Sequence, residues 1–125
     1  MTGEQILVVE DNEKNMKLFR DVLVATGYRT LEATTGREAV DLASEHTPDL
    51  VLMDIQLPDL DGVQALQRLR EDDRTAGIPV LALTAQAMRG DRERFLAAGF
   101  DGYLSKPVDV RELIGTVRDH CRGAG

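Results

Sequence analysis

The sequence predicts an α/β protein in which a doubly wound parallel β-sheet lies between two layers of helices. Short apolar runs rich in branched residues alternate five times with segments of helical periodicity. Several of these runs are apolar on both faces, which is typical of parallel strands joined by right-handed helical crossovers. With 125 residues, of which 42% are hydrophobic and 30% charged, the chain is expected to form a single domain over residues 1–125.

The expected strands and helices cover almost the whole chain in alternation. The strand-like runs are QILVVE (5–10), YRTLEA (28–33), DLVLMD (49–54), IPVLALT (78–84) and DGYLSKP (101–107). Helical periodicity covers 13–26, 37–44, 63–70, 89–98 and 110–121. Gly27 is expected to cap the first helix, whose apolar stripe should contain Leu18, Phe19, Val22 and Leu23. Residues 1–4 and 122–125 are expected to be frayed.

Composition and charge argue against several classes of function. The net charge is −7, so a general electrostatic attraction to nucleic acid or anionic lipid is not expected. The longest apolar runs contain only a few residues, far fewer than the roughly 18 that a membrane span needs. The N-terminal residues MTGEQ show no signal peptide, and the single cysteine, Cys121, cannot form an internal disulfide. A cytoplasmic protein is therefore expected.

Polar side chains follow four of the five predicted strands at the point where each strand ends. In order along the chain they are Glu10, Asp11, Asp54, Thr84 and Lys106. Because the carboxyl ends of parallel strands meet at one edge of the sheet, these side chains are expected to converge. The predicted edge strand ends in Ala33 and Thr34 and brings no acid, so the acidic residues do not simply follow every strand.

The residue types at these strand ends indicate a metal-assisted phosphoryl site. Carboxylates a few ångströms apart at partial burial repel by about 4 kcal/mol per pair at an effective dielectric constant of about 20, so they need a cation between them. Oxygen ligands at this density suit Mg²⁺, which keeps water ligands that a phosphate can replace. Lys106 and Thr84 would then neutralise and bond the oxygens of a phosphoryl group during in-line transfer to Asp54 as the nucleophile.

Four motifs make the chain similar to a known family. VVEDN, LMDIQLPDLDG, LTAQAM and GYLSKP, in this order, resemble the receiver domain of bacterial two-component response regulators over essentially the whole chain. VVEDNEKNMKLF and YLSKPVDV are also similar to DivK-type single-domain regulators. The resemblance implies a flavodoxin-like (βα)5 receiver fold with strand order 2-1-3-4-5. It also implies a phosphoacceptor regulator that catalyses only its own phosphorylation and dephosphorylation, rather than an enzyme.

The resemblance assigns roles to individual residues of the acidic site. Asp54 would be the phosphorylated aspartate. Asp11, Asp54 and the backbone carbonyl of Gln56 would bind Mg²⁺ directly, and Glu10 would bind it through water. Lys106 would pair with the phosphoryl oxygens. These roles complete the phosphoryl site that the strand ends suggest.

Further residues are implied to act as a switch or to tune reaction rates. Thr84 would move to bond the phosphoryl group, and Tyr103 would follow from an outward to an inward rotamer. Gln56 and Gln86 would tune the attack of water on the acyl phosphate. The small Ala85 would leave room for the phosphodonor.

The resemblance also implies protein partners. The phosphodonor would be a histidine kinase or a histidine phosphotransfer protein, with no direct binding of nucleic acid or membrane. The downstream target would bind the face formed by the fourth helix, the fifth strand and the fifth helix. Met16, which lies off the predicted apolar stripe of the first helix, is a candidate contact with the phosphodonor. The protein would be a monomer or a phosphorylation-dependent dimer, with a cis peptide between Lys106 and Pro107.

Other functions are left open by the residues alone. A phosphatase of the haloacid dehalogenase type needs an acid two residues after its nucleophile, where this sequence has Gln56. A flavodoxin-like nucleotide binder needs a glycine- or hydroxyl-rich loop after the first strand, where Glu10 and Asp11 would repel phosphate. The main alternatives are a phosphorylation-independent scaffold and a receiver fragment of a larger regulator or hybrid kinase.

Several polar residues have simpler interpretations. Asp59 and Asp61 are candidates for additional metal ligands, but aspartate beside proline and glycine is usually turn or cap chemistry. His46 and His120 are widely separated and have no ligand-like partner nearby in the sequence, so both are expected at the surface. The run MRGDRERF mixes basic and acidic residues, which is typical of a solvated helix face.

Overall fold

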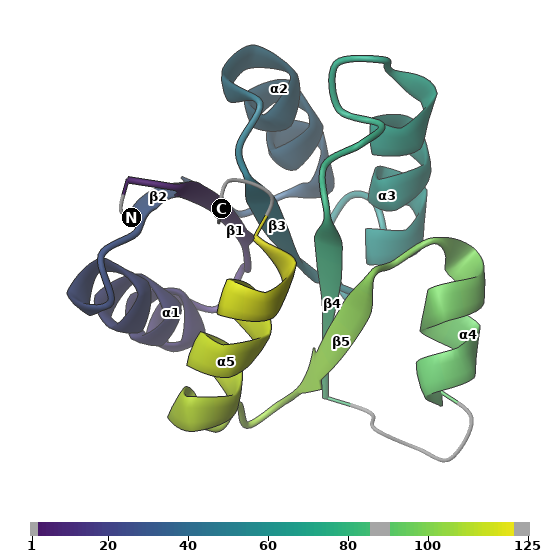
Figure 1. Ribbon diagram of the computed structural model, residues 1–125. Helices are drawn as coiled ribbons and strands as arrows, with labels where there is room; N and C mark the ends of the chain where they lie inside the picture. Colours follow the sequence, from purple (N-terminus) through teal and green to yellow (C-terminus); the bar gives the residue numbers. More distant parts are fainter. Residues whose placement is uncertain (1–2, 86–90, 122–125) are drawn as a thin grey trace.

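The computed structural model describes residues 3–85 and 91–121, which form a parallel sheet of five strands in the order β2-β1-β3-β4-β5, flanked by helices (Figure 1). The strands are β1 (Gln5–Val9), β2 (Arg29–Ala33), β3 (Leu50–Asp54), β4 (Val80–Thr84) and β5 (Gly102–Ser105). The helices are α1 (Glu13–Ala25), α2 (Gly36–His46), α3 (Gly62–Glu71), α4 (Asp91–Ala98) and α5 (Val110–His120). The predicted fold class and strand order are confirmed.

Some predictions fall outside the described residues. These predictions concern Gln86, the start of the fourth helix at residue 89, and the ends of the chain at residues 1–2 and 122–125. Gly3 and Glu4, which were also expected to be frayed, are bonded to β2. Arg29 N donates to Glu4 O at 2.9 Å, and Arg29 Nε donates to Gly3 O at 2.8 Å.

Each face of the sheet is covered by its own helices. One core contains Leu7, Val9, Val51 and Met53 with buried residues of α2, α3 and α4. The other contains Ile6, Val8, Leu50 and Leu52 with buried residues of α1 and α5. Figure 1 shows α1 and α5 together on one side of the sheet, with α2 and α3 on the other. Successive strand residues point to opposite faces, so the central strands are apolar on both.

The structure corrects the predicted apolar face of α1. Met16, Phe19 and Leu23 are buried, whereas Leu18 is 39% exposed. The buried residues are separated by three and four positions, which is the spacing of one helix face. Met16 packs into the core, so the prediction that Met16 lies off the apolar face is wrong, while its contact with a phosphodonor stays a prediction. Gly27 follows the helix with a φ of 104°, which agrees with the predicted C-terminal cap.

No helix within residues 3–85 and 91–121 is long and apolar enough to cross a membrane.

Helix starts are set by side chains that bond first-turn N–H groups. Asn12, Thr35 and Asp109 cap α1, α2 and α5 in this way. Thr35 explains why α2 starts at Gly36, one residue earlier than predicted. At α3, Asp61 and Gln64 form a capping box, so the interpretation of Asp61 as a cap is confirmed.

The turn from β3 into α3 brings two backbone segments into close contact at Gly62. Gly62 N donates to Ile55 O at 2.8 Å. A Cβ atom at Gly62 would lie 2.6 Å from the carbonyl oxygen of Asp54 and 2.8 Å from Ile55 Cα. Because both atoms belong to the backbone, a side chain at this position would displace the end of β3 or the start of α3.

We expect Gly62→Ala to lower the free energy of unfolding by about 1–3 kcal/mol, because the added methyl group overpacks the turn. Gly115→Ala in α5 is a matched control, since the nearest atom to its Cβ would be Arg118 Nη2 at 4.0 Å. That variant is expected to be more stable by roughly 0.5–1 kcal/mol, as for alanine in place of glycine within a helix. Urea unfolding followed by circular dichroism measures both. Equal stability of Gly62→Ala and wild type would contradict the steric argument.

Candidate functional site

The predicted site residues lie around one cleft at the carboxyl ends of β1, β3 and β4, which are adjacent in the sheet. The cleft has a volume of about 460 Å³, and its walls include Glu10, Asp11, Asp54, Gln56, Thr84, Ala85 and Lys106. Parallel strands end at the same edge, so residues far apart in the sequence converge there. Of the predicted site residues that the structure describes, Tyr103 does not line this cleft.

Lys106 lies between two buried carboxylates. Its Nζ is 2.6 Å from Glu10 Oε1 and 2.9 Å from Asp54 Oδ2. Glu10 is 1% exposed and Asp54 is 5% exposed. The contact with Asp54 is a hydrogen bond, whereas Glu10 Oε1 has an ion pair but no well-aligned hydrogen bond among the described residues. Lys106 N also donates to Thr84 O at 2.7 Å, and the Lys106–Pro107 peptide is cis, as the resemblance implied.

Burial and charge act in opposite directions on this cluster. Burial is the main cause that raises the pKa of Glu10; Lys106 opposes this effect, and the charge of Asp54 adds to it. Burial by itself would lower the pKa of Lys106, but bonds to Glu10 and Asp54 outweigh burial and raise the pKa of the ammonium. Lys106 is therefore held in its charged form.

Three carboxylates provide a donor set for a divalent cation. One oxygen from each of Glu10, Asp11 and Asp54 can be chosen so that all lie within 4.8 Å of one another. When these three acids and Lys106 are ionised, three negative charges and one positive charge leave a net −2. Glu10 Oε1 is already 2.6 Å from Lys106 Nζ, so the excess negative charge of the three acids, rather than an unpaired oxygen, favours a further cation. The residues present fit Mg²⁺, which prefers oxygen ligands.

The carboxylates also order the backbone that follows each strand. Gln56 N donates to Asp54 Oδ1 at 2.9 Å, and Asn12 N donates to Glu10 Oε2 at 3.1 Å. Ile55 N donates to Leu83 O at 3.0 Å and so extends the pairing between β3 and β4. The backbone around Gln56 is therefore tied to Asp54 at the rim of the cleft.

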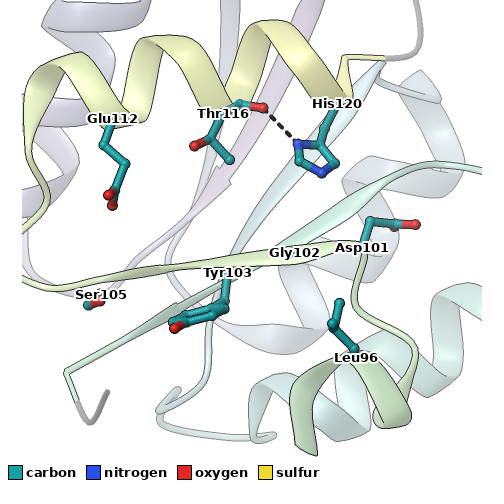
Figure 2. Close-up of a pocket in the computed structure, with 8 residues that line it drawn as sticks. All are labelled: Leu96, Asp101, Gly102, Tyr103, Ser105, Glu112, Thr116 and His120. Carbon is teal, nitrogen blue, oxygen red and sulfur yellow. Dashed lines mark hydrogen bonds between the residues drawn. The ribbon is translucent and has the colours of Figure 1, made fainter. Parts of the chain in front are cut away.

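Tyr103 lines a separate hollow of about 410 Å³ beside β5 (Figure 2). Its ring centroid is 6.1 Å from that of Phe95 in α4. Figure 2 shows Glu112, Thr116 and His120 pointing from α5 toward β5, with Tyr103 on the opposite side of the strand. Thr84 and Tyr103, the predicted switch residues, therefore border two different hollows.

Two residues have contacts that the sequence did not indicate. Arg94 is exposed, as the mixed run MRGDRERF predicted, but it also lines the acidic cleft and an adjacent apolar pocket of about 430 Å³. No sequence signal distinguished Arg94 from its charged neighbours. His120 is half-buried and its Nδ1 lies 2.9 Å from Thr116 O, so its prediction as a surface residue is only partly right. His46 is exposed, as predicted.

Asp59 serves as a cap for a helix that is distant in the sequence. Its Oδ1 accepts a hydrogen bond from Gly36 N at 2.7 Å, and its Oδ2 accepts one from Arg37 N at 3.0 Å. Both N–H groups belong to the first turn of α2, 23 and 22 residues before Asp59. The interpretation as cap chemistry is confirmed, although the sequence did not indicate which helix is capped.

Sequence comparisons place this fold and cleft among known proteins. Residues 6–118 match the response regulator receiver domain family. The polar-differentiation response regulator DivK of Brucella anthropi is 50% identical over 121 residues, which are 97% of this chain and 98% of the Brucella protein. DivK of Brucella ovis is 49% identical over the same shares of both chains.

Solved structures give the same result. The receiver domain of a sensor histidine kinase from Pseudomonas aeruginosa, which has a magnesium ion coordinated in its active site cleft, is 39% identical with a TM-score of 0.87. The match covers 95% of this chain and 98% of that one. The receiver domain of Francisella response regulator 1452 is 30% identical with a TM-score of 0.85, covering 92% and 93% of the two chains. This chain belongs to the response regulator receiver domain family of two-component signalling proteins. The assignment rests on the family match, on relatives that match over nearly their full length, and on the acidic cleft.

Proposed function

We propose that this protein takes a phosphoryl group from a phosphohistidine donor onto Asp54 and that phosphorylation changes its affinity for a protein partner. The position of the Asp54 carboxylate carries the proposal. It is 5% exposed but borders the cleft, with Oδ1 bonded to Gln56 N and Oδ2 bonded to Lys106 Nζ. A carboxylate held in one orientation beside a fixed ammonium is prepared for attack on phosphorus. The protein would thus be a phosphoacceptor regulator rather than a turnover enzyme.

The residues around the cleft support an in-line transfer. An oxygen of Asp54 forms a bond to phosphorus while the bond from phosphorus to the donor's imidazole nitrogen breaks, and that electron pair stays on the nitrogen. Lys106 neutralises one phosphoryl oxygen and the hydroxyl of Thr84 donates to another. Ala85 is small and exposed beside Thr84, which leaves room for the donor. Gln56 borders the same approach and is placed to tune the attack of water on the acyl phosphate.

Mg²⁺ is the cofactor in this proposal. Asp11, Asp54 and the backbone carbonyl of Gln56 would hold it directly, with Glu10 bound through water. When bound, it would neutralise charge on the transferring phosphoryl oxygens. The clustered carboxylate oxygens support this assignment, as does the magnesium ion in the cleft of the Pseudomonas receiver domain.

We further propose that Thr84 and Tyr103 carry the signal away from Asp54. Thr84 is paired with Ser105 across the β4–β5 ladder, and Tyr103 is paired with Ala82 two positions earlier. Movement of Thr84 toward a phosphoryl oxygen would open space that the ring of Tyr103 can enter. The phosphoryl group would thus favour one of two pre-existing states of the protein.

The surface formed by α4, β5 and α5 is the proposed output face. Tyr103 lines its hollow together with Leu96 of α4 and Glu112 of α5, so a new Tyr103 rotamer would change the shape of this face (Figure 2). The phosphodonor would be a histidine kinase or a histidine phosphotransfer protein. A phosphorylation-dependent dimer is the alternative to a monomer, and the cytoplasmic location stays a prediction.

Asp54→Asn is expected to abolish phosphorylation while leaving the fold intact, because the change removes the nucleophile and relieves repulsion between carboxylates. Intact mass after incubation with acetyl phosphate, in Mg²⁺ and in EDTA, measures this. Asp61→Asn is the control, since it removes an acid close in sequence while asparagine still caps α3. A Mg²⁺-dependent adduct on wild type and Asp61→Asn alone is the expected result. Phosphoryl labelling of Asp54→Asn would overturn the assignment of Asp54 as the phosphoacceptor. If wild type is not labelled by acetyl phosphate and also accepts no phosphate from a phosphohistidine protein, the result would favour a scaffold.

Lys106→Met is expected to lower the free energy of unfolding by roughly 3 kcal/mol in EDTA, because Glu10 and Asp54 lose their shared cation. Added Mg²⁺ should restore part of this loss. The same variant should accept phosphate from acetyl phosphate about a hundredfold more slowly. Urea unfolding with and without Mg²⁺, and the rate of adduct formation, test the two effects separately. A rate within a few-fold of wild type would show that Lys106 is structural only.

Phosphorylation is expected to shift the backbone amide resonances of α4, β5 and α5 as well as those around Asp54. Tyr103 and Thr116, which line the hollow in Figure 2, are the residues to follow in heteronuclear spectra recorded before and after addition of acetyl phosphate. Asp54→Asn provides the control for direct effects of the reagent. Shifts confined to the residues that line the acidic cleft would contradict the assignment of the output face.

A further inference from the structure

The loop at residues 55–61 connects β3 to α3 and contains Gln56, whose carbonyl belongs to the proposed metal site. Gln56 is tied to Asp54 Oδ1 at the start of the loop, and Gly62 N is bonded to Ile55 O at its end. The segment between these ties reaches across to α2 through Asp59. These two bonds hold the base of the loop, and Asp59 connects its outer part to α2.

Asp59 and the N-cap residue Thr35 accept hydrogen bonds from different N–H groups in the first turn of α2. Thr35 Oγ1 accepts from Glu38 N at 3.1 Å, while the two oxygens of Asp59 accept from Gly36 N and Arg37 N. A negative charge at a helix N-terminus is also favoured by the helix dipole. Burial by itself would raise the pKa of Asp59, but the backbone bonds from Gly36, Arg37 and its own loop outweigh burial and lower the pKa. The carboxylate is thus held charged against α2.

An apolar contact reinforces this link. Leu60 is buried beside Gly36, and a Cβ atom at Gly36 would lie 2.8 Å from Leu60 Cβ and 3.4 Å from Asp59 Oδ1. Glycine at position 36 therefore allows the loop to lie directly on the first turn of α2. Polar and apolar contacts fix the loop at the same point.

We propose that Asp59 is a positioning residue for Mg²⁺, because its bonds to α2 restrict the movement of the loop that contains Gln56, a proposed metal ligand. The inference rests on the metal site proposed above. Asp59 is three residues beyond Gln56, and without its anchor the intervening backbone would gain freedom that metal binding must then remove. Asp59 does not need to touch the metal, since both of its oxygens are bonded to α2. Partners that orient metal ligands in this way commonly control metal affinity.

Isothermal titration of the full chain with MgCl₂ tests the inference without any phosphorylation. Asp59→Ala is expected to bind Mg²⁺ about tenfold more weakly than wild type. Asp61→Asn is the matched control, because it removes one negative charge from the same loop but keeps a residue that caps α3. Its dissociation constant is expected to stay within about twofold of wild type, since an exposed charge is largely screened by salt.

The outcomes separate this inference from the proposed function. Weaker binding by Asp59→Ala than by Asp61→Asn supports the positioning role, and equal binding by the two variants overturns it while leaving the phosphoacceptor proposal intact. A wild type that binds no Mg²⁺ would overturn the metal site itself. If circular dichroism shows that Asp59→Ala does not fold, Gly36→Ala tests the same contact from the helix side with all charges retained. Unchanged Mg²⁺ affinity in folded Gly36→Ala would overturn the inference, and weakened affinity would support it.

Discussion

The ion pairs of Lys106 with two buried carboxylates are the interaction on which the rest of the site depends. Glu10 follows β1 and Asp54 ends the adjacent β3, and two such charges repel by about 4 kcal/mol at a separation of 4 Å and an effective dielectric constant of about 20. The ammonium enters from the end of β5 and contacts both acids at 2.6 and 2.9 Å. The ammonium reduces the repulsion between the buried acids, but with Asp11 included the cluster still has excess negative charge. A second cation can therefore be bound there, and a phosphoryl group can be accommodated with it.

The sheet explains why these charges can be held so rigidly. β3 and β4 are buried along their whole length, and β1 is buried from Ile6 to Val9. Apolar burial on both faces fixes the strands, so the residues at their carboxyl ends have little freedom to separate. Hydrophobic packing thus supplies the stability that offsets the electrostatic cost of the cleft. The acidic site occupies the strand ends because the strand interiors have no space for hydrated groups.

The sequence predicted the strand ends well and the contacts between distant elements poorly. Asp54 and Thr84 each follow an apolar run, so their convergence was a consequence of parallel topology alone. The buried face of α1 was harder to predict, because Met16 and Leu18 are similarly apolar. Which of the two is buried depends on how the helix packs on the sheet. Asp59 was recognisable as a cap residue, but its helix lies 22 to 23 residues earlier and the pairing requires the folded loop. Local periodicity contains no information on such contacts.

The two sides of Asp54 differ in how firmly they are held, and this difference gives the proposed switch a direction. On the α2 side, the loop after β3 is fixed by Asp59, by Leu60 and by the close backbone contact at Gly62. On the other side, Thr84 leads to an exposed Ala85, and the neighbouring β5 is an edge strand bonded to β4 alone within the described sheet. Displacing an edge strand disrupts fewer backbone hydrogen bonds than displacing a central one. New bonds formed at a phosphorylated Asp54 would therefore displace the Thr84 side chain and β5 more readily than the loop that contains Gln56, so the proposed metal ligands would stay in place while the surface around Tyr103 changes.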